Sequence, residues 1–304
     1  MTVLVTGATG LIGRHTLAHL LERGEHVRTF QRGQPDVEHA GSVETIVGDV
    51  CLDAQRLCEA ARGCDAIVHL AGRGDVGESH RDPLGYANLN AGGALHALEA
   101  ARGARAHFIL ASSQRVYRPG PEPRAEDDAP APDSPYGYAK WVAEVWCRMA
   151  SEQFGVPTSV LRFFSVYGPG QQPNGGSGVV AIFARAALAG EPLVVQSRGR
   201  RDFTHARDVA RGIGLVLEAR RTRPGPGLHC VYNIATGRGT TFTDLARRIV
   251  ELSGSRSPIE DCARDAPGAD LVADVGRARA ELGFEACIDL AAGVKSYLDW
   301  LRAA

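Results

Sequence analysis

Three glycines between a β-branched run and an amphipathic segment constrain the fold of this chain more than any other feature. Residues 3–6 read VLVT, and residues 7–13 continue as GATGLIG. Gly7 permits a tight turn, Gly10 leaves the backbone open to close approach, and Gly13 lets a helix pack against the strand. This G-x-x-G-x-x-G spacing, placed where a strand gives way to a helix, predicts the first strand–turn–helix unit of a parallel sheet.

Short β-branched runs alternate with helical patterns through about residue 165. This alternation predicts an α/β fold with a doubly wound parallel sheet of the Rossmann type. The regularity then fades, so we expect a first domain over 1–165 and a smaller α/β domain over 166–304, some of whose segments return to pack on the first. Six prolines and five acidic residues between 119 and 135 predict a solvated loop. Strands are expected at 3–6, 26–30, 45–47, 66–70, 107–111 and 159–163, and helices after the glycine turn, around 86–101, and near 179–188, 242–253 and 290–302.

The composition excludes several classes of protein. Among 304 residues, 34 Lys and Arg balance 35 Asp and Glu, so no basic excess favours nucleic-acid binding. No apolar run approaches the roughly 20 residues that span a bilayer, and a strand-like run follows Met1 directly where a secretory signal would begin. The seven cysteines lack C-x-x-C spacing, and only His15 and His19 among ten histidines lie four residues apart. We expect reduced core thiols in a cytoplasmic protein, surface histidines and no metal site.

The glycine turn favours a dinucleotide site, because the first N–H groups of a helix lack partners within it and bind phosphate. Its spacing differs from the usual G-x-G-x-x-G. An acid at the end of the second strand would accept the ribose hydroxyls of NAD, but Gln31 and Arg32 stand there and Arg14 follows the turn. Arginine accommodates a 2′-phosphate, so the sequence leans toward NADP over NAD. Asp49 is suited to accept a hydrogen bond from the adenine amino group.

Tyr136 and Lys140 lie four residues apart at the start of a predicted helix, so they share one face. A phenol, with a pKa of about 10, is a poor base unless a nearby cation stabilises its phenolate. Lys140 is suited to do this and to bind the nicotinamide ribose, and Ser113 is suited to hydrogen-bond the reacting oxygen. Only Lys140 and Lys295 among the 34 basic residues are lysines. A planar guanidinium does not reproduce a compact ammonium, so we expect Lys295, but not Lys140, to tolerate replacement by arginine.

Ten short motifs occur along nearly the whole chain. They are TGATGLIG (6–13), GDV (48–50), HLAG (69–72), GES (77–79), NLNAGGAL (88–95), ASSQRVY (111–117), SPYGYAK (134–140), LRFFSVYGPGQ (161–171), RDFTHARDVA (201–210) and VYNIATG (231–237). In this order they resemble the extended short-chain dehydrogenase/reductase family, in its NAD-dependent epimerase/dehydratase branch typified by UDP-glucose 4-epimerase. The resemblance also implies a homodimer with a four-helix interface, built from the helix that carries Tyr136 and the helix around 86–101.

The resemblance implies roles for individual residues. Ser113, Tyr136 and Lys140 are implied as the catalytic triad, and Arg201 as a clamp on a substrate diphosphate, with Ser112 and Ser165 also at the substrate. Together with the residues already considered, the expected cofactor site comprises Gly7, Thr9, Gly10, Leu11, Ile12, Gly13, Gln31, Arg32, Asp49, Val50, Leu70, Ala71, Gly72, Asn90, Tyr136, Lys140 and Phe164.

The chain departs from the family pattern at the implied diphosphate clamp. Epimerases often have asparagine where this chain has Ser165, and an R-x-G-D segment where residues 266–269 read APGA. Because two contacts to a diphosphate are thus missing, we hypothesise that Arg198 or Arg200 in a short basic loop replaces them, since a guanidinium chelates phosphate oxygens. Solvated loop arginines are the alternative.

These features predict an NAD(P)-dependent epimerase of a sugar on a nucleoside diphosphate, which acts through a transient keto intermediate. Dehydratases of this branch carry acidic residues directly after the triad serine or threonine, and Gln114 and Arg115 disfavour that reaction. The alternative is an NADPH-dependent ketoreductase of a keto-sugar or another small carbonyl compound, favoured by Gln31, Arg32 and the altered clamp. A non-catalytic dinucleotide-binding sensor would be expected to lose Tyr136 or Lys140. The expected partner is a small molecule, with no nucleic acid or membrane.

Overall fold

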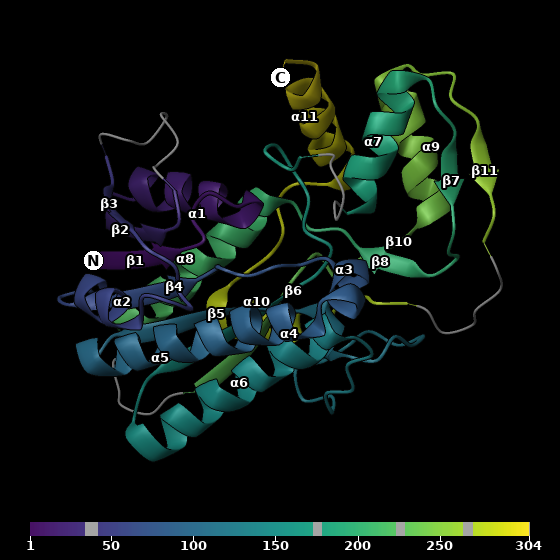
Figure 1. Ribbon diagram of the computed structural model, residues 1–304. Helices are drawn as coiled ribbons and strands as arrows, with labels where there is room; N and C mark the ends of the chain where they lie inside the picture. The colour runs from purple at the N-terminus through teal and green to yellow at the C-terminus, as the bar shows by residue number, and fades with distance from the viewer. Residues whose placement is uncertain (34–41, 173–177, 223–228, 264–269, 304) are drawn as a thin grey trace.

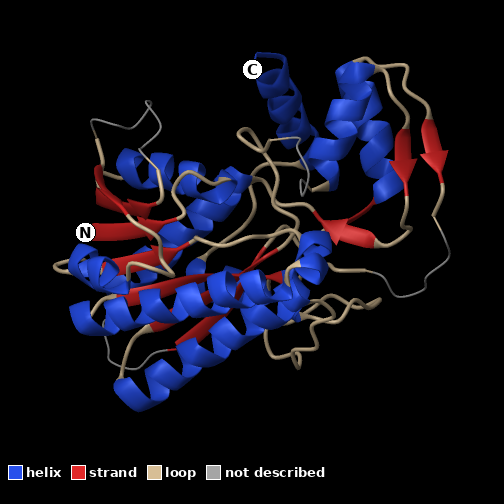
Figure 2. Cartoon of the chain, viewed as in Figure 1, coloured by secondary structure: helices blue, strands red, loops and turns tan. Residues whose placement is uncertain are grey.

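A seven-stranded parallel sheet forms the centre of the molecule, with helices on both faces (Figures 1 and 2). The computed structural model describes residues 1–33, 42–172, 178–222, 229–263 and 270–303. The strand order is β3-β2-β1-β4-β5-β6-β9, so the chain reverses direction across the sheet between β1 and β4. Such a switch point opens a crevice at the carboxyl ends of the strands. The strands are β1 (Thr2–Thr6), β2 (His26–Gln31), β3 (Glu44–Val47), β4 (Ala66–His69), β5 (His107–Ser113), β6 (Thr158–Phe163) and β9 (His229–Ile234).

The predicted Rossmann-type sheet is confirmed, with one strand more than expected. Every residue of β4, β5 and β6 is buried, as is typical of parallel strands covered on both faces. The additional strand, β9, lies far beyond residue 165 and pairs in parallel with β6. It belongs to 166–304, from which some segments were expected to return to the first domain, but no local pattern in the sequence identified it as a strand of this sheet.

Two helical layers cover the sheet. The helices α1 (Leu11–Glu22), α8 (Ala206–Thr222) and α10 (Gly276–Leu282) bury apolar residues against one face, including Leu20 and Ile213. The opposite layer consists of α2 (Ala54–Ala61), α5 (Gly93–Ala104) and α6 (Pro135–Phe154), of which α5 and α6 run along the front of Figure 1.

The helix expected around 86–101 is a composite. It consists of α4 (Pro83–Tyr86), a π-helical segment (Ala87–Gly92) and α5, and a short unpredicted helix, α3 (Val76–Arg81), precedes it. Within the π-helical segment, Asn90 Oδ1 accepts from the backbone N–H of Arg73 and its Nδ2 donates to the carbonyl of the same residue, both at 3.1 Å. π-Helical turns occur frequently at functional sites, and this one fixes the chain directly after β4.

The C-terminal part forms a smaller unit, at the upper right of Figure 1. The three helices expected there are confirmed, and their cores include the buried Leu245, Ile249 and Val294. Two short two-stranded sheets complete the unit. Its elements are α7 (Val179–Ala189), β7 (Leu193–Val195), β8 (Arg200–Asp202), β10 (Gly239–Thr241), α9 (Phe242–Ser253), β11 (Ile259–Asp261) and α11 (Leu290–Ala303).

The proline-rich loop before α6 is less solvated than its composition predicts. It contains no helix or long strand, but Arg124 forms a parallel bridge with Ala273. Glu126 is 8% exposed and accepts a hydrogen bond from the backbone of Asn233 at 2.8 Å. The loop therefore packs against the end of the sheet, because later segments of the chain pair with its backbone.

The expectations of core cysteines and surface histidines hold only in part. All seven thiols are free, but only Cys64 and Cys147 are buried, and three others are exposed. His15 is half-buried, and its Nε2 is 2.8 Å from the carbonyl oxygen of Pro169; His19 is also half-buried. The reason is that α1 packs under α8 and the loop after β6, which the local sequence does not show. In the described residues, no helix is long and apolar enough to cross a membrane.

Candidate active site

A cavity of about 720 Å³ opens at the carboxyl ends of β1, β4 and β5. Gly7, Leu70 and Ser113 line it from the ends of these strands, and Phe203 and Phe242 line it from the C-terminal unit. The cavity therefore lies at the switch point of the sheet, where open α/β folds bind their ligands.

The glycine turn forms a cradle at one end of this cavity. Gly7 has φ +71°, and a Cβ there would lie 2.6 Å from the backbone nitrogen of Ala71. A Cβ on Gly13 would lie 2.2 Å from the carbonyl oxygen of Gly7. The first hydrogen bond of α1 runs from Arg14 N to Gly10 O, so the three preceding N–H groups have no partner within the helix. The N-terminus of α1 is therefore electropositive and offers N–H donors, which fits the pyrophosphate of a dinucleotide.

Ser113 and Tyr136 meet at the carboxyl end of β5. Ser113 is the last residue of that strand, and its hydroxyl hydrogen-bonds the phenol of Tyr136. Ser134 caps α6 by accepting from Gly137 N at 3.2 Å, which starts the helix directly before Tyr136. Burial raises the pKa of Tyr136, whereas the hydrogen bond from Ser113 and the positive charge of Arg115 act in the opposite direction.

Lys140 lies one turn further along α6 and is almost completely buried. Its Nζ donates to the carbonyl oxygen of Ala111 in β5 at 2.8 Å. Burial lowers the pKa of Lys140 to about 8, while the negative charge of Glu144 opposes that shift. That Lys140 stabilises the Tyr136 phenolate stays a prediction; Ser113 and Arg115 also act to lower the pKa of Tyr136.

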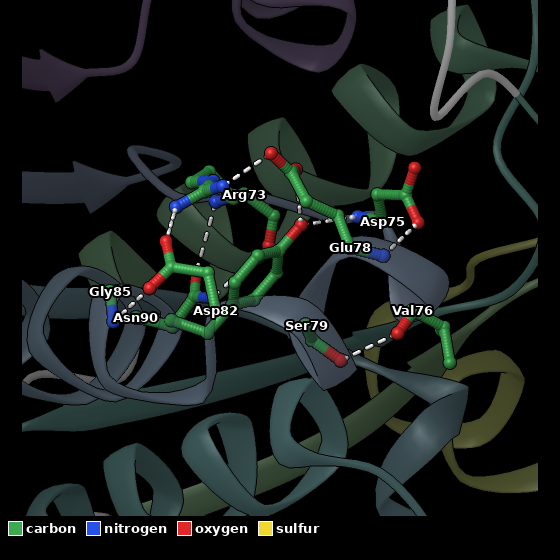
Figure 3. Close-up of polar contacts among 9 residues, drawn as sticks. Arg73, Asp75, Val76, Glu78, Ser79, Asp82, Gly85 and Asn90 are labelled. Atoms are coloured by element: carbon green, nitrogen blue, oxygen red, sulfur yellow. Dashed lines mark hydrogen bonds and ion pairs between the residues drawn. The ribbon is translucent and has the colours of Figure 1, made fainter.

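A cluster of polar side chains that the sequence did not reveal forms the wall after β4 (Figure 3). Arg73 bonds Asp82 at 2.6 Å and also bonds Glu78, whose second oxygen accepts from the hydroxyl of Tyr86 at 2.9 Å. The guanidinium of Arg73 lies 4.5 Å above the ring of Tyr86. Tyr86 in turn stands edge-on to Tyr136, with 6.3 Å between ring centroids. The position of the cluster in the sequence could have indicated this role, because its residues follow the strand at the switch point of the sheet.

The hydrogen bonds of this cluster also determine which of its side chains are ionised. Hydrogen bonds from Arg73 lower the pKa values of Glu78 and Asp82, and burial raises the pKa of Tyr86 to about 12. Tyr86 therefore stays protonated near neutrality and remains a hydrogen-bond donor to Glu78.

Arg201 is the expected substrate contact that lines the cavity from the C-terminal unit. It follows Arg200 in β8, and its guanidinium lies 5.3 Å from the ring centroid of Phe242. Burial lowers its pKa to about 10, and the charge of Arg115 acts in the same direction. The two cations therefore face a common space.

The arginines hypothesised to replace the missing clamp lie elsewhere. Arg198 pairs with Asp261 at 3.6 Å, and Arg200 pairs with Asp270 at 2.8 Å. Neither lines the cavity, because Arg198 in the loop before β8 and Arg200 in β8 itself both pair with acids outside it. Residues 266–269, where an R-x-G-D segment was sought, lie outside the described residues.

The two serines expected at the substrate both line the cavity. Ser112 donates its hydroxyl to the buried carboxylate of Glu144. Ser165 accepts from Gln114 Nε2 at 3.0 Å and has φ +28°, a strained value for a residue with a side chain. Strain of this kind is held in place by surrounding contacts and clusters at functional sites.

The cavity divides the expected site residues into two groups. Those that line it are Gly7, Gly10, Leu11, Ile12, Gly13, Leu70, Gly72, Ser112, Ser113, Tyr136, Lys140, Ser165 and Arg201. Those that do not are Thr9, Gln31, Arg32, Asp49, Val50, Ala71, Asn90, Phe164 and Arg198. Among the latter, Phe164 is fully buried beside Tyr117, and Asp49 accepts from Cys51 N at 2.8 Å. In the part of the chain that the structure describes, no group of three His, Cys, Asp or Glu side chains could hold a metal.

A glycine cradle and a Ser113, Tyr136 and Lys140 site on one Rossmann-type sheet define an enzyme of the extended short-chain dehydrogenase/reductase class. The model of the NAD-dependent epimerase/dehydratase family matches residues 3–235, and the chain belongs to this family.

Relatives and solved structures of the family match over the full length. The UDP-glucose 4-epimerase of Neisseria meningitidis serogroup C is 30% identical, over 98% of this chain and 96% of that protein. UDP-glucose 4-epimerase from Thermotoga maritima, solved with UDP-glucose, has a TM-score of 0.88 and 30% identity, over 100% of this chain and 99% of that chain. MoeE5, solved with UDP-glucuronic acid and NAD, has a TM-score of 0.87 and 33% identity over the same shares.

Proposed function

We propose that the protein is an NAD-dependent epimerase of nucleoside-diphosphate sugars that acts through a transient keto intermediate. The observation that carries this proposal is the meeting of Ser113, Tyr136 and Lys140 in the cavity that also contains the glycine cradle. When bound, NAD would supply reversible acceptance of a hydride from the sugar carbon. Tyr136 would remove the hydroxyl proton as general base, and Ser113 would hold the same oxygen.

The charges around the cavity favour an epimerase over a dehydratase. Gln114 and Arg115 line the cavity directly after Ser113, so no carboxylate stands there to move the protons of water loss. Of the described residues that line the cavity, only Asp75 and Glu78 are acidic. Asp75 accepts from the backbone N–H of Glu78, and Glu78 itself bonds Arg73 and Tyr86.

We propose NAD as the cofactor, although the residues at the end of the second strand favoured NADP in the sequence. Several related structures were solved with NAD, among them MoeE5 and the UDP-glucose 4-epimerase of Thermus thermophilus. Within this chain, Gln31 donates its amide to Gly33 O at 3.0 Å, and Arg14 donates to Thr9 O at 3.3 Å. The exposed Arg32 at the end of β2 is the observation that keeps the NADPH-dependent ketoreductase as a second candidate.

Arg201 is proposed to bind the substrate diphosphate. It enters the cavity from the C-terminal unit, opposite the helix end that would hold the cofactor phosphates. We accordingly propose that residues 1–165, with the returning α8, β9 and α10, bind the cofactor, and that the remainder of 166–304 binds the substrate. Related structures hold a neutral and an acidic UDP-sugar, which leaves both kinds of sugar as candidates for this chain.

The test begins with denaturation of the purified protein and identification of any released dinucleotide. UDP-, GDP- and dTDP-sugars are then screened for isomeric products without added cofactor. Bound NAD and an isomerised sugar are expected for the wild type, and Tyr136→Phe is expected to lower the rate by at least about 100-fold. Consumption of added NADPH with net reduction would instead establish the ketoreductase. Full activity of Tyr136→Phe would contradict the role of this phenol.

We also propose a homodimer with a four-helix interface, to which each of two copies contributes α6 and the helix around 86–101. Tyr138, Val142 and Val145 occupy one face of α6 and are between 38% and 52% exposed, a contiguous apolar stripe that favours association. Sedimentation should show a dimer for the wild type and a monomer for Val142→Glu. Val194→Glu, at a similarly exposed valine in β7, is the matched control and should remain dimeric. A monomeric wild type would refute this interface.

A further inference from the structure

Arg115 is the positively charged residue of the cavity lining that lies two residues after Ser113 in the sequence and contacts the start of α6. It lies in a short helical turn after β5, and its backbone N–H donates to the hydroxyl oxygen of Ser113 at 3.2 Å. Its carbonyl oxygen packs so closely on α6 that a Cβ on Gly137 would come within 2.4 Å of it. Gly137 directly follows Tyr136, so the backbone of Arg115 lies between Ser113 and the start of the helix that carries Tyr136. The fold therefore fixes the backbone of Arg115 beside Ser113 and the residue that follows Tyr136.

The guanidinium of Arg115 retains hydrogen-bonding capacity. Its side chain lines the cavity and is 20% exposed. One terminal nitrogen donates to Asp133 at 2.9 Å, whereas Nε is buried without a hydrogen-bond partner. A guanidinium has five N–H donors in one plane, and a carboxylate is the acceptor that matches two of them at once.

Arg115 and Arg201 both line this part of the cavity, and Asp133 and Asp270, which do not line it, offset part of their charge. Arg201 lies near enough for the charge of Arg115 to lower its pKa, and two like charges in a partly buried space repel each other. The acids on the opposite wall do not compensate them, because Glu78 bonds Arg73 and Tyr86, and Asp75 caps α3 (Figure 3). An anionic ligand would relieve this repulsion.

We propose that Arg115 is a specificity-determining residue that binds a carboxylate on the sugar, and that the preferred substrates are nucleotide-linked uronic acids. The inference rests on the proposed function and names the substrate class of that site. A nucleotide sugar already places a diphosphate near Arg201. Arg115 lies instead beside Ser113 and Tyr136, where the sugar ring must react, so its charge fits an anion on the sugar itself. A neutral sugar without a suitably placed acceptor would leave the buried Nε of Arg115 without a hydrogen-bond partner, since Asp133 accepts only from a terminal nitrogen.

The experiment compares UDP-glucuronic acid with UDP-glucose, in turnover and in calorimetric binding, with UDP alone as a third ligand. A charge-assisted, bidentate contact predicts that the wild type favours the acid by about 10- to 100-fold in kcat/KM. Arg115→Gln should abolish that preference and leave the affinity for UDP unchanged. Because the charge of Arg115 also acts to lower the pKa of Tyr136, some rate is expected to be lost on both sugars, so the ratio of the two sugars is the readout. Arg115→Lys should retain part of the preference, because lysine keeps the positive charge but cannot donate two parallel hydrogen bonds to a carboxylate. Arg118→Gln, at an exposed arginine of the same segment that does not line the cavity, should behave as the wild type.

Three results would overturn the proposal: a wild-type preference for UDP-glucose, an equal loss on both sugars in Arg115→Gln, or a lower affinity of this variant for UDP. The last result would make Arg115 a diphosphate contact. Failure of the proposed function is distinguishable, because it would appear as absent isomerisation with every sugar. Tighter, Arg115-dependent binding of UDP-glucuronic acid in that case would still support recognition of the carboxylate.

Discussion

Arg162 and Glu144 form a two-pronged ion pair inside the protein, between β6 and α6. Arg162 donates from Nε and from a terminal nitrogen to the two carboxylate oxygens, at 3.1 and 2.6 Å. Their side chains are 4% and 7% exposed. Ser112 donates to the same carboxylate, and Glu144 lies one helical turn after Lys140. The pair therefore connects the hydrophobic core to the catalytic helix.

Removal of one partner of this pair should be costly. Arg162→Met is expected to lower the free energy of unfolding by about 3–5 kcal/mol, because it leaves a buried carboxylate unpaired. The double variant Arg162→Met/Glu144→Gln should be more stable than Arg162→Met alone, since neither charge then remains. Denaturant unfolding measures both, and Arg102→Met, at an exposed pair with Glu99, is the surface control. Strict additivity of the two single substitutions would refute the coupling.

Lys140 should be required for activity while it costs stability. Its pKa is lowered to about 8 by burial, so the unfolded chain binds more protons between that pH and about 10.5, and stability rises with pH across this window. Lys140→Met should abolish turnover, raise the melting temperature at pH 7 and remove this part of the pH dependence. Lys295→Arg is the control, because Lys295 makes only an exposed pair with Asp299 at 2.6 Å. A lower melting temperature for Lys140→Met would show that its bond to Ala111 outweighs the burial penalty.

Substitution of the third glycine of the turn should damage cofactor binding. In Gly13→Ala the new methyl group would meet the carbonyl oxygen of Gly7 at 2.2 Å, and backbone cannot yield as a flexible side chain can. We expect substoichiometric dinucleotide in the purified variant and a lower melting temperature. Gly103→Ala is the matched change in α5, where nothing lies within 4 Å. It should raise stability by up to about 1 kcal/mol, so an equal response of both variants would contradict a steric cause.

Two buried histidines should make the protein sensitive to acid. Burial lowers the pKa values of His69 and His107 to about 3, and each ring has one buried nitrogen without a partner. The unfolded chain therefore binds more protons below pH 6.5, and stability falls as the pH drops from there toward 3. Between pH 6.5 and 5 each histidine should cost about 2 kcal/mol. His107→Gln should flatten the pH dependence of the unfolding free energy, whatever its effect at pH 7; an unchanged slope would contradict this assignment.

The sequence by itself determined the features whose causes are local. The glycine spacing at 7, 10 and 13 predicts the cradle because the turn needs a positive φ at Gly7, and a Cβ at Gly13 would collide with the carbonyl oxygen of Gly7. The four-residue spacing of Tyr136 and Lys140 places both on one face of α6, and buried β-branched runs locate six strands of the sheet. Each of these conclusions needs only the geometry of one turn, one helix or one strand.

Tertiary structure decided which distant residues share the cavity. Arg198 and Arg201 are close in sequence, yet only Arg201 lines the cavity, because Arg198 is drawn to Asp261. Arg73 and Tyr86 become a wall of the site only when Asn90 fixes the chain after β4. The added strand β9 likewise depends on its pairing with β6. In each case the outcome depends on contacts between segments far apart in the chain, whose geometry no local pattern contains.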